Sequence, residues 1–472
     1  MKASTPAQTR VASTPLKHLR AAAYLAVILC FLAFKTTKLQ IFGLALSASS
    51  LLAIVISLPV AAPLARTIAI VFVSGGSLLL WRAGLGFGEF VGAFGQMAYL
   101  IALFAVLPVL AAPIRLGGYS GAIQSLMLGR VRTTFSFNCI TTSIAYICGA
   151  FVSMAAIPIM MASMRPVVDN FPLGSKQRFM TVSAISGYVL PLFWTPVSGI
   201  VGVVLQSLQL DWLSLFPLLL LLSLVCLGMN WLIFRLIEGN GPHSAEPALA
   251  AGLTAPDSER HSPLPHLMQM VSGILVLLLS IVVLEHWMRV GLVTVVTLLA
   301  IPAALIWCMM LGHGKRFAFE GSREFFGRLP HMADQYAVFL SAGFLATAIV
   351  MSGTDHMVNV LFLQMNEAIG SRILLLLMPV MTLAVSFLGV HPLVGIALLG
   401  EALRPEVLGI SSTQLAITLI GSSVLTFMLG PFSGTLGLVQ NISQTSTFRL
   451  AWWNTPYAAG YFFVLCLFIL FI

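Results

Sequence analysis

Two predominantly apolar runs without a charged residue, 213–234 and 267–284, are each long enough to cross a lipid bilayer. A helix that spans the hydrocarbon core needs about 20 mostly apolar residues. Both runs are apolar on all sides, whereas the strands of a membrane barrel alternate polar and apolar residues. Because a backbone in lipid must satisfy its own hydrogen bonds, the runs predict transmembrane helices.

Composition supports the same interpretation. Only 8% of the 472 residues are charged, whereas soluble domains carry about 25%. The net charge of +9 comes from Lys and Arg scattered through short loops, so it does not indicate nucleic-acid binding. All six cysteines lie in apolar segments without metal-ligand spacing, which predicts buried small residues and no metal site: Cys30, Cys139, Cys148, Cys226, Cys308 and Cys466.

Hydropathy predicts eleven spans and two helical hairpins. The spans are 21–34, 41–58, 66–82, 92–113, 179–210, 213–236, 267–284, 289–312, 335–353, 415–442 and 455–472. The hairpins, 134–164 and 372–403, are too long for one span, short for two, and carry Gly149 and Gly389 near their middles. One long tilted helix or two tight spans is the alternative for each. A polar linker occupies 237–266.

Charge placement predicts the orientation of the chain. With a cytoplasmic N-terminus and each hairpin returning to its own side, only six of the 24 Lys and Arg residues fall outside the cytoplasm: Lys35, Lys38, Arg82, Arg289, Arg372 and Arg404. This bias is what the positive-inside rule demands. We therefore expect a bacterial-type inner-membrane protein with a cytoplasmic N-terminus and a periplasmic or extracellular C-terminus.

An internal repeat relates the two halves of the chain at a constant offset of 235 residues. The segment that begins at Glu89 matches the segment that begins at Glu324, for example through Phe104 and Phe339. The same offset pairs the later segments TPVSGIVGVV and GPFSGTLGLV. Five predicted crossings separate the first matched spans, so the repeats should be inverted. Inverted repeats are typical of secondary transporters.

The repeat divides the chain into four parts. These are a cytoplasmic segment with a leading helix (1–40), a first repeat (41–236), the cytoplasmic linker (237–266) and a second repeat (267–472).

Each repeat contains a Pro-Ser-Gly motif inside an apolar stretch. Pro removes a helix hydrogen bond and Gly tolerates open backbone, so each motif should unwind its helix in the membrane. Exposed N–H groups there could bind an anion and freed carbonyls could bind Na⁺. The alternative is a structural proline kink. The candidate site residues are Thr195, Pro196, Ser198, Gly199, Pro431, Ser433 and Gly434.

The hairpin tips provide four further candidates, Gly149, Ser153, Gly389 and His391. His391 lies deep in an apolar stretch, where it could bind substrate, carry a proton or serve a structural role. All fifteen acidic residues are expected in or near loops, Glu401 among them. Coupling through a buried carboxylate is therefore not expected.

This architecture resembles the ion transporter superfamily, and within it the divalent anion–sodium symporter branch. The likeness rests on two inverted five-span repeats with a hairpin and a Pro-broken helix in each. Thr195-Pro196 and the 430–434 segment are similar to the family's broken-helix motifs, whereas its Ser-Asn-Thr hairpin tips are missing. The resemblance implies a homodimer and elevator-like movement of the hairpins.

The sequence thus predicts a secondary active transporter, not an enzyme, that moves a small anionic solute with Na⁺ or H⁺ and binds no other cofactor. An exporter of an organic anion on the same fold is one alternative. A membrane-embedded transferase or a lipid-linked sugar flippase is another. Paired carboxylates for Mg²⁺, in DxxD or DxD spacing, do not occur in the sequence, which disfavours the transferase.

Overall fold

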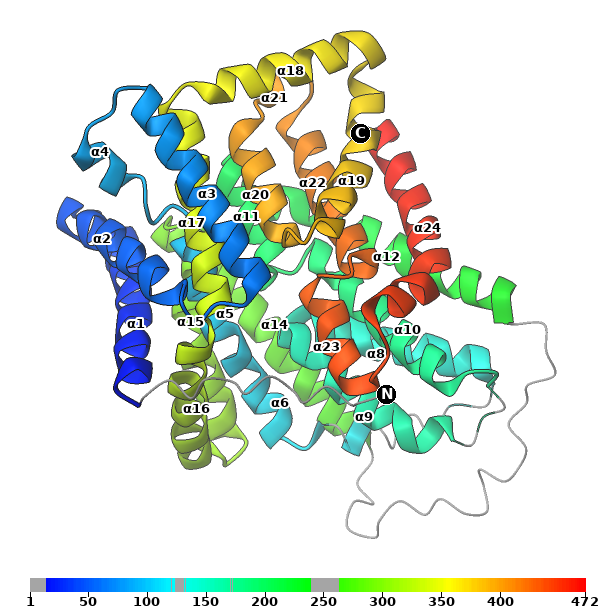
Figure 1. Ribbon diagram of the computed structural model, residues 1–472. Coiled ribbons are helices and arrows are strands. Elements are labelled where there is room, and N and C mark those ends of the chain that lie inside the picture. The colour runs from blue at the N-terminus through cyan, green and yellow to red at the C-terminus, as the bar shows by residue number, and fades with distance from the viewer. Residues whose placement is uncertain are drawn as a thin grey trace, which may run out of the picture.

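The computed structural model describes residues 14–119, 121–123, 131, 133–169, 171, 173–238 and 263–472. All regular elements that these residues form are helices, and several run between the upper and lower ends of the molecule (Figure 1). Most of the linker predicted at 237–266 lies outside the described residues.

The first half of the chain forms eleven α-helices and three short 3-10 turns in its described part. They are α1 (Thr14–Thr37), α2 (Gln40–Ser57), α3 (Pro63–Arg82), α4 (Phe87–Gly92), α5 (Ala98–Val106), η1 (Leu107–Ala111), α6 (Ala112–Leu116), α8 (Thr134–Val152), η2 (Ser153–Ala155), α9 (Ala156–Val168), α10 (Lys176–Val189), η3 (Leu190–Phe193), α11 (Gly199–Leu208) and α12 (Trp212–Glu238).

The second half follows the same general order of long, hairpin and broken helices. It contains α14 (Pro263–Met288), α15 (Leu292–Met310), α16 (Gly314–Arg328), η4 (Leu329–His331), α17 (Ala333–Met351), α18 (Thr354–Ile369), α19 (Ser371–Phe387), α20 (Pro392–Ala402), α21 (Pro405–Leu408), α22 (Ser412–Leu429), α23 (Gly434–Ser443) and α24 (Thr447–Phe471).

Eleven helical segments of the described chain are long and apolar enough to cross a membrane. Ten coincide with predicted spans. The eleventh, Thr134–Val168, is α8 with α9, where a hairpin was predicted. The span predicted at 179–210 is divided into α10 and α11, which are each too short to cross alone. The prediction of an all-helical polytopic membrane protein is confirmed.

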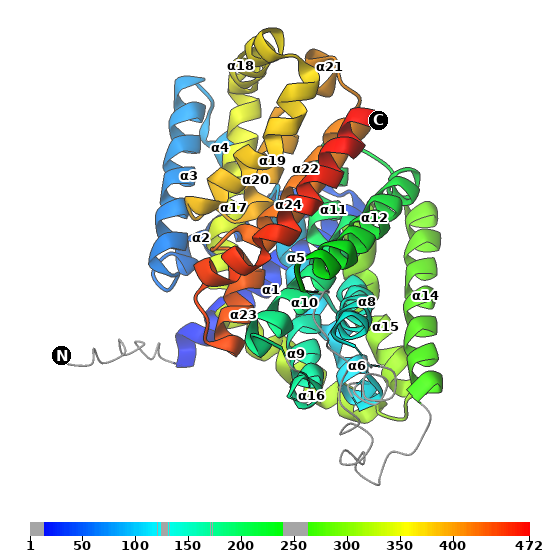
Figure 2. The same ribbon diagram turned by 90° about the vertical axis from the view of Figure 1, so that its right-hand side faces the viewer.

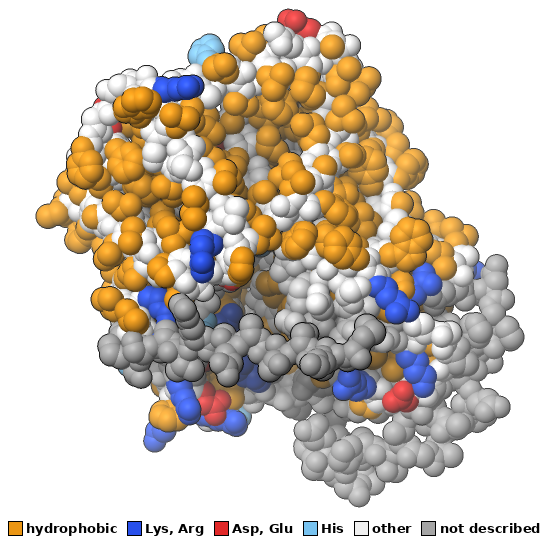
Figure 3. All heavy atoms as spheres, in the orientation of Figure 1, with side chains coloured by type: hydrophobic (Ala, Val, Ile, Leu, Met, Phe, Trp, Pro, Cys, Tyr) orange, Lys and Arg blue, Asp and Glu red, His pale blue; other side chains and the backbone are white. Residues whose placement is uncertain are grey.

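The helices differ in how much of their surface the fold covers. α22 is buried continuously from Leu415 to Met428, whereas α3 buries only Ala69, Gly76 and Leu80. Apolar side chains also cover much of the outer face in Figure 3, with Lys and Arg gathered towards its lower end. A surface of this kind suits contact with lipid chains, because apolar side chains are favourable against hydrocarbon and unfavourable in water.

The two predicted hairpins fold back on themselves. Phe137 near the start of α8 and Phe171 beyond the end of α9 have ring centroids 5.0 Å apart, so both open ends lie together. At the second hairpin, Asn366 just before α19 donates a 3.1 Å hydrogen bond to the carbonyl of Leu408 beyond α20. That these hairpins re-enter the bilayer stays a prediction.

Both predicted helix breaks are present. Residues 194–198 separate η3 from α11, and residues 430–433 separate α22 from α23. Figures 1 and 2 show the chain rising from α10 to α11 and descending from α22 to α23. The two broken helices therefore run in opposite directions. Inversion of the complete repeats stays a prediction.

Residues that the repeat pairs also meet in space. The rings of Phe104 and Phe339, 235 positions apart, have centroids 5.5 Å from each other. A Cβ on Gly199 would lie 3.4 Å from Leu393 of the second hairpin, and one on Gly434 would lie 2.7 Å from Met154 of the first. Each broken helix thus contacts the hairpin of the other half.

Candidate solute-binding site

A cavity of about 520 Å³ lies where the two hairpin turns and the second broken helix meet. Four predicted site residues line it: Ser153, Gly389, His391 and Gly434. Its walls are mainly apolar and aromatic, including Phe104, Phe339 and Phe432. Pockets for small solutes commonly combine such walls with a few convergent polar groups.

A larger cavity, of about 1030 Å³, lies between α11–α12 and α14–α15. It contains none of the predicted site residues, and Asp211 and Glu285 place two carboxyl groups in its lining. Since both hairpin turns lie at the smaller cavity and neither lines the larger one, the smaller cavity is the candidate site.

The first hairpin turns at Ser153, not at Gly149. Ser153 adopts a positive φ of 52° where α8 ends. Gly149 lies within α8, and a Cβ there would be 3.0 Å from the backbone carbonyl oxygen of Tyr188. The glycine predicted at the tip therefore serves close packing between α8 and α10, one turn before the chain reverses.

The second hairpin turns at Gly389, whose φ of 93° favours glycine. His391 then caps α20: its Nδ1 accepts a 3.3 Å hydrogen bond from the N–H of Leu393. Phe339 and Phe427 lie edge-on to the imidazole, with centroids 5.4 and 6.1 Å away. The packing and the cap set the direction of the ring at the cavity wall.

The Pro-Ser-Gly motifs support the cavity without lining most of it. Ser198 and Ser433 cap α11 and α23 by accepting 3.3 Å hydrogen bonds from the N–H groups of Ile200 and Leu436. Both serines are buried. These residues position helix N-termini.

The other motif residues are also enclosed. Thr195, Pro196 and Pro431 are buried, and the Thr195 hydroxyl donates a hydrogen bond to the carbonyl of Ala150 in the first hairpin. Gly199 packs against Phe104 of the cavity wall. These contacts hold the first hairpin and the first break together.

Tyr188 is a site-supporting residue that sequence reasoning missed. It is buried at the end of α10, and its hydroxyl interacts with the side chain of Ser153. It therefore connects α10 with the first hairpin turn. A tyrosine in an apolar helix gives no local signal of this role.

Arg328 and Asp334 line the cavity on the side of α16 and α17, and sequence reasoning missed both. The Asp334 carboxylate accepts a 2.7 Å hydrogen bond from the N–H of Ala62, which anchors it at the start of α3. The Arg328 side chain is 56% exposed and lies 4.0 Å from Glu324. A positive charge can therefore reach the cavity entrance.

Glu401 lies near a loop, as expected, one residue before the end of α20. This residue lies inside α20, is partly buried, and accepts a 3.2 Å hydrogen bond from the Ser207 hydroxyl of α11. The predicted hairpin, 372–403, ends two residues after Glu401, and hydropathy gives no sign that a side chain of α11 contacts this carboxyl group.

Within the described ranges, His, Cys, Asp and Glu form no group that could hold a metal ion. The six cysteines are free, and Cys148, Cys226 and Cys308 are buried. The candidate site is lined by hydroxyl, imidazole, amide, guanidinium, carboxylate and backbone groups.

Comparison with solved structures shows what fold this is. The chain matches the crystal structure of the YdaH transporter of Alcanivorax borkumensis, described as having an unusual topology, with a TM-score of 0.58. The match covers 85% of this chain and 97% of that one, at 16% sequence identity. This chain has the fold of a membrane transporter. No family model matches it, and no curated protein matches its sequence.

Proposed function

We propose that this chain is a secondary transporter that moves a small anionic solute across the membrane by alternating access. The observation that carries the proposal is the single cavity at which both hairpin turns and the start of α23 converge. Interrupted helices at a common site are how such transporters bind solutes in the middle of a bilayer.

Helix ends at the cavity favour a negative charge. Ser153–Ala155 lead into α9, His391 caps α20, and Gly434 begins α23, so three helix N-termini meet there. Each N-terminus carries unpaired N–H groups and a partial positive charge. Arg328 and Asp334 of the same lining carry opposite charges, so the helix ends supply the preference for an anion. An organic acid or an inorganic oxyanion is the solute class that fits.

The contacts between repeat-related residues support the alternating mechanism. Gly199 meets the second hairpin and Gly434 meets the first, so the two halves make corresponding contacts. If the complete halves are inverted copies with re-entrant hairpins, exchanging their conformations exposes the site on one side and then on the other.

The proposal includes Na⁺ or H⁺ as the coupling ion, a bacterial-type inner membrane with a cytoplasmic N-terminus, and a homodimer with elevator-like movement. Uptake is the favoured direction, and export of an organic anion is the second candidate. A transferase or a lipid-linked sugar flippase finds less support, because the solved transporter shares the fold over most of its length.

A binding screen tests the proposal. The purified protein would be heated with succinate, citrate, acetate, sulfate or phosphate, each with and without Na⁺. A solute that binds only the folded state should raise the melting temperature. The same solute should then accumulate in liposomes that contain the protein. Absence of binding and uptake for every anion, together with binding of a cation or a lipid-linked sugar, would contradict the proposal.

The cap serines provide a residue-level test. Ser198→Ala and Ser433→Ala should each lower uptake, because a lost N-cap costs about 1 kcal/mol and loosens a helix N-terminus near the site. Membrane insertion should be unchanged. Ser272→Ala, on an exposed turn of α14, is the matched control. Unchanged uptake in both cap variants would remove the broken helices from the site.

A further inference from the structure

Glu401 is a carboxyl group that the cavity does not use, and its surroundings are unusual for an acid. It lies one residue before the end of α20, where the helix dipole disfavours a negative charge. Ser207 of α11 donates a hydrogen bond to it, and the Gln96 side chain also interacts with it. All the hydrogen-bond partners found for it are neutral.

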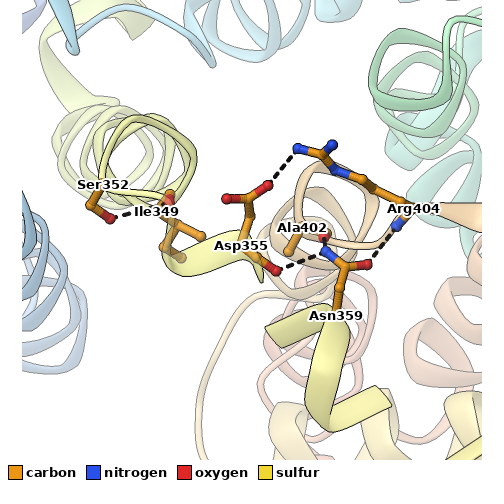
Figure 4. A network of polar contacts seen from close by, with 6 residues as sticks. All are labelled: Ile349, Ser352, Asp355, Asn359, Ala402 and Arg404. Atoms are coloured by element: carbon orange, nitrogen blue, oxygen red, sulfur yellow. Dashed lines mark hydrogen bonds and ion pairs between the residues drawn. The ribbon is translucent and has the colours of Figure 1, made fainter. Parts of the chain in front are cut away.

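The nearest cation in the sequence is already engaged. Arg404 extends towards α18, where its Nη2 lies 2.6 Å from the Asp355 carboxylate (Figure 4). Asn359 strengthens this arrangement by accepting a 3.0 Å hydrogen bond from the Arg404 N–H and donating one of 2.7 Å to the Ala402 carbonyl. Among the described residues, no Lys or Arg forms an ion pair with Glu401.

The elements packed against α20 offer Glu401 little other charge. α11 and α22 carry no titratable side chain, and Tyr99 of α5 is buried nearby. The remaining titratable or charged groups on the neighbouring elements are Asp334 and Tyr336 of α17, Asp355, His356 and Glu367 of α18, Arg372 of α19, and Glu406 of α21. Partial burial without a cationic partner disfavours the ionised form of a carboxyl group.

From this placement we propose that Glu401 is a proton-binding site, and that its proton is the one coupled to solute movement. The coupling rests on the transporter function proposed above; the binding of the proton does not. Partial exposure of Glu401 and exposure of Gln96 leave a route for a proton from water.

One short helix connects the proton site to the cavity. α20 begins at the cap residue His391, which lines the cavity, and carries Glu401 near its other end. The seam between α20 and α11 is tight at that level, since a Cβ on Gly400 would lie 3.0 Å from Ser207. An ionised Glu401 favours water and an open seam, whereas a protonated one is compatible with the closed seam. Proton binding thereby biases the hairpin that holds one wall of the site.

Infrared difference spectroscopy tests proton binding without any solute. The purified wild-type protein should show the C=O stretch of a protonated carboxyl group at a pH where an exposed glutamate is already ionised, and this signal should disappear as the pH is raised further. Glu401→Gln should lose this signal, and Glu406→Gln, at an exposed acid on α21, should retain it. Retention of the full signal in Glu401→Gln would place the proton elsewhere and overturn the proposal.

Ser207→Ala keeps the carboxyl group and tests the contact itself. The Ser207 hydroxyl stabilises the ionised form, so its removal should raise the midpoint of the titration by about half to one pH unit. An unchanged midpoint in a folded variant would contradict the hydrogen-bonded site.

Liposomes then test the coupling. For an anion that the wild type accumulates, an imposed pH gradient should increase the accumulation, and Glu401→Gln should exchange the anion without responding to the gradient. A response equal to that of the wild type would remove Glu401 from coupling. If no anion is carried at all, the transport proposal fails while the infrared result stands independently.

Discussion

Gly149 lies at a close contact between α8 and α10, and it has no side chain because the neighbouring backbone leaves no room. The carbonyl oxygen and Cα of Tyr188 would be 3.0 and 3.1 Å from an added Cβ. Backbone atoms cannot move aside as a flexible side chain can. At the residue scale, the geometry of the first hairpin therefore depends on one missing methyl group.

Gly149→Ala should destabilise the protein by about 1–3 kcal/mol, because overpacking forces two helices apart. Gly228→Ala is the matched control: its site in α12 has open space within 4 Å of the added Cβ. There the better helix propensity of alanine should leave stability unchanged or raise it by up to about 1 kcal/mol. Thermal unfolding in detergent measures both. Equal melting temperatures would show that α8 and α10 are not tightly packed at Gly149.

At the scale of elements, α18 holds the outgoing leg of the second hairpin. α18 meets α19 at a bend of 120° and lies across the upper end of the molecule in Figure 1. Its Asp355 binds Arg404, and the two partners differ in environment: the Asp355 side chain is 6% exposed and that of Arg404 is 59% exposed. The loss of folding stability on breaking the pair should depend on which of the two charged groups remains after the other is substituted.

Arg404→Ala should lower stability by about 1–3 kcal/mol, since it leaves a buried carboxylate without a partner. Asp355→Asn should cost less than about 1 kcal/mol, because the freed guanidinium is largely in water already. Arg372→Ala, at an exposed position of α19, is the control and should stay within about 0.5 kcal/mol of the wild type. Chemical denaturation followed by tryptophan fluorescence ranks the free energies of unfolding of the three variants. A larger loss in Asp355→Asn would contradict this account.

At the scale of the whole molecule, the two hairpins open at opposite ends. α9 and α16 lie towards the lower end in Figures 1 and 2, and α18 and α21 lie towards the upper end. The charge distribution in the sequence predicts that the lower end faces the cytoplasm. The opposite openings of the hairpins and the charge distribution together assign a side of the membrane to every exposed loop position.

In a variant whose six native cysteines are replaced, single cysteines at the exposed positions Asp169 and Lys315 should react only with reagents that reach the cytoplasmic side. Cysteines at Glu367 and Glu406, also exposed, should react only from the outside. Labelling intact cells and then inverted vesicles with an impermeant maleimide makes the comparison. Labelling of Asp169→Cys and Glu406→Cys from the same side would exclude opposite openings of the hairpins.

Much of the fold was predictable because the bilayer acts on each segment separately. The length and apolarity of a run decide whether it can cross, so ten predicted spans coincide with candidate spans of the structure. The breaks at 194–198 and 430–433 were predictable for a similar reason. Proline and glycine disturb a helix through their own backbone chemistry, whatever surrounds them.

Convergence of the site was decided by tertiary structure alone. The turn at Ser153, the position of Tyr188 and the partial burial of Glu401 all depend on contacts with segments distant in sequence, which no local pattern encodes. Sequence by itself therefore determined which segments can cross the membrane and where they are interrupted. Only packing decided which interruptions meet, because contact depends on how whole helices fill space against one another.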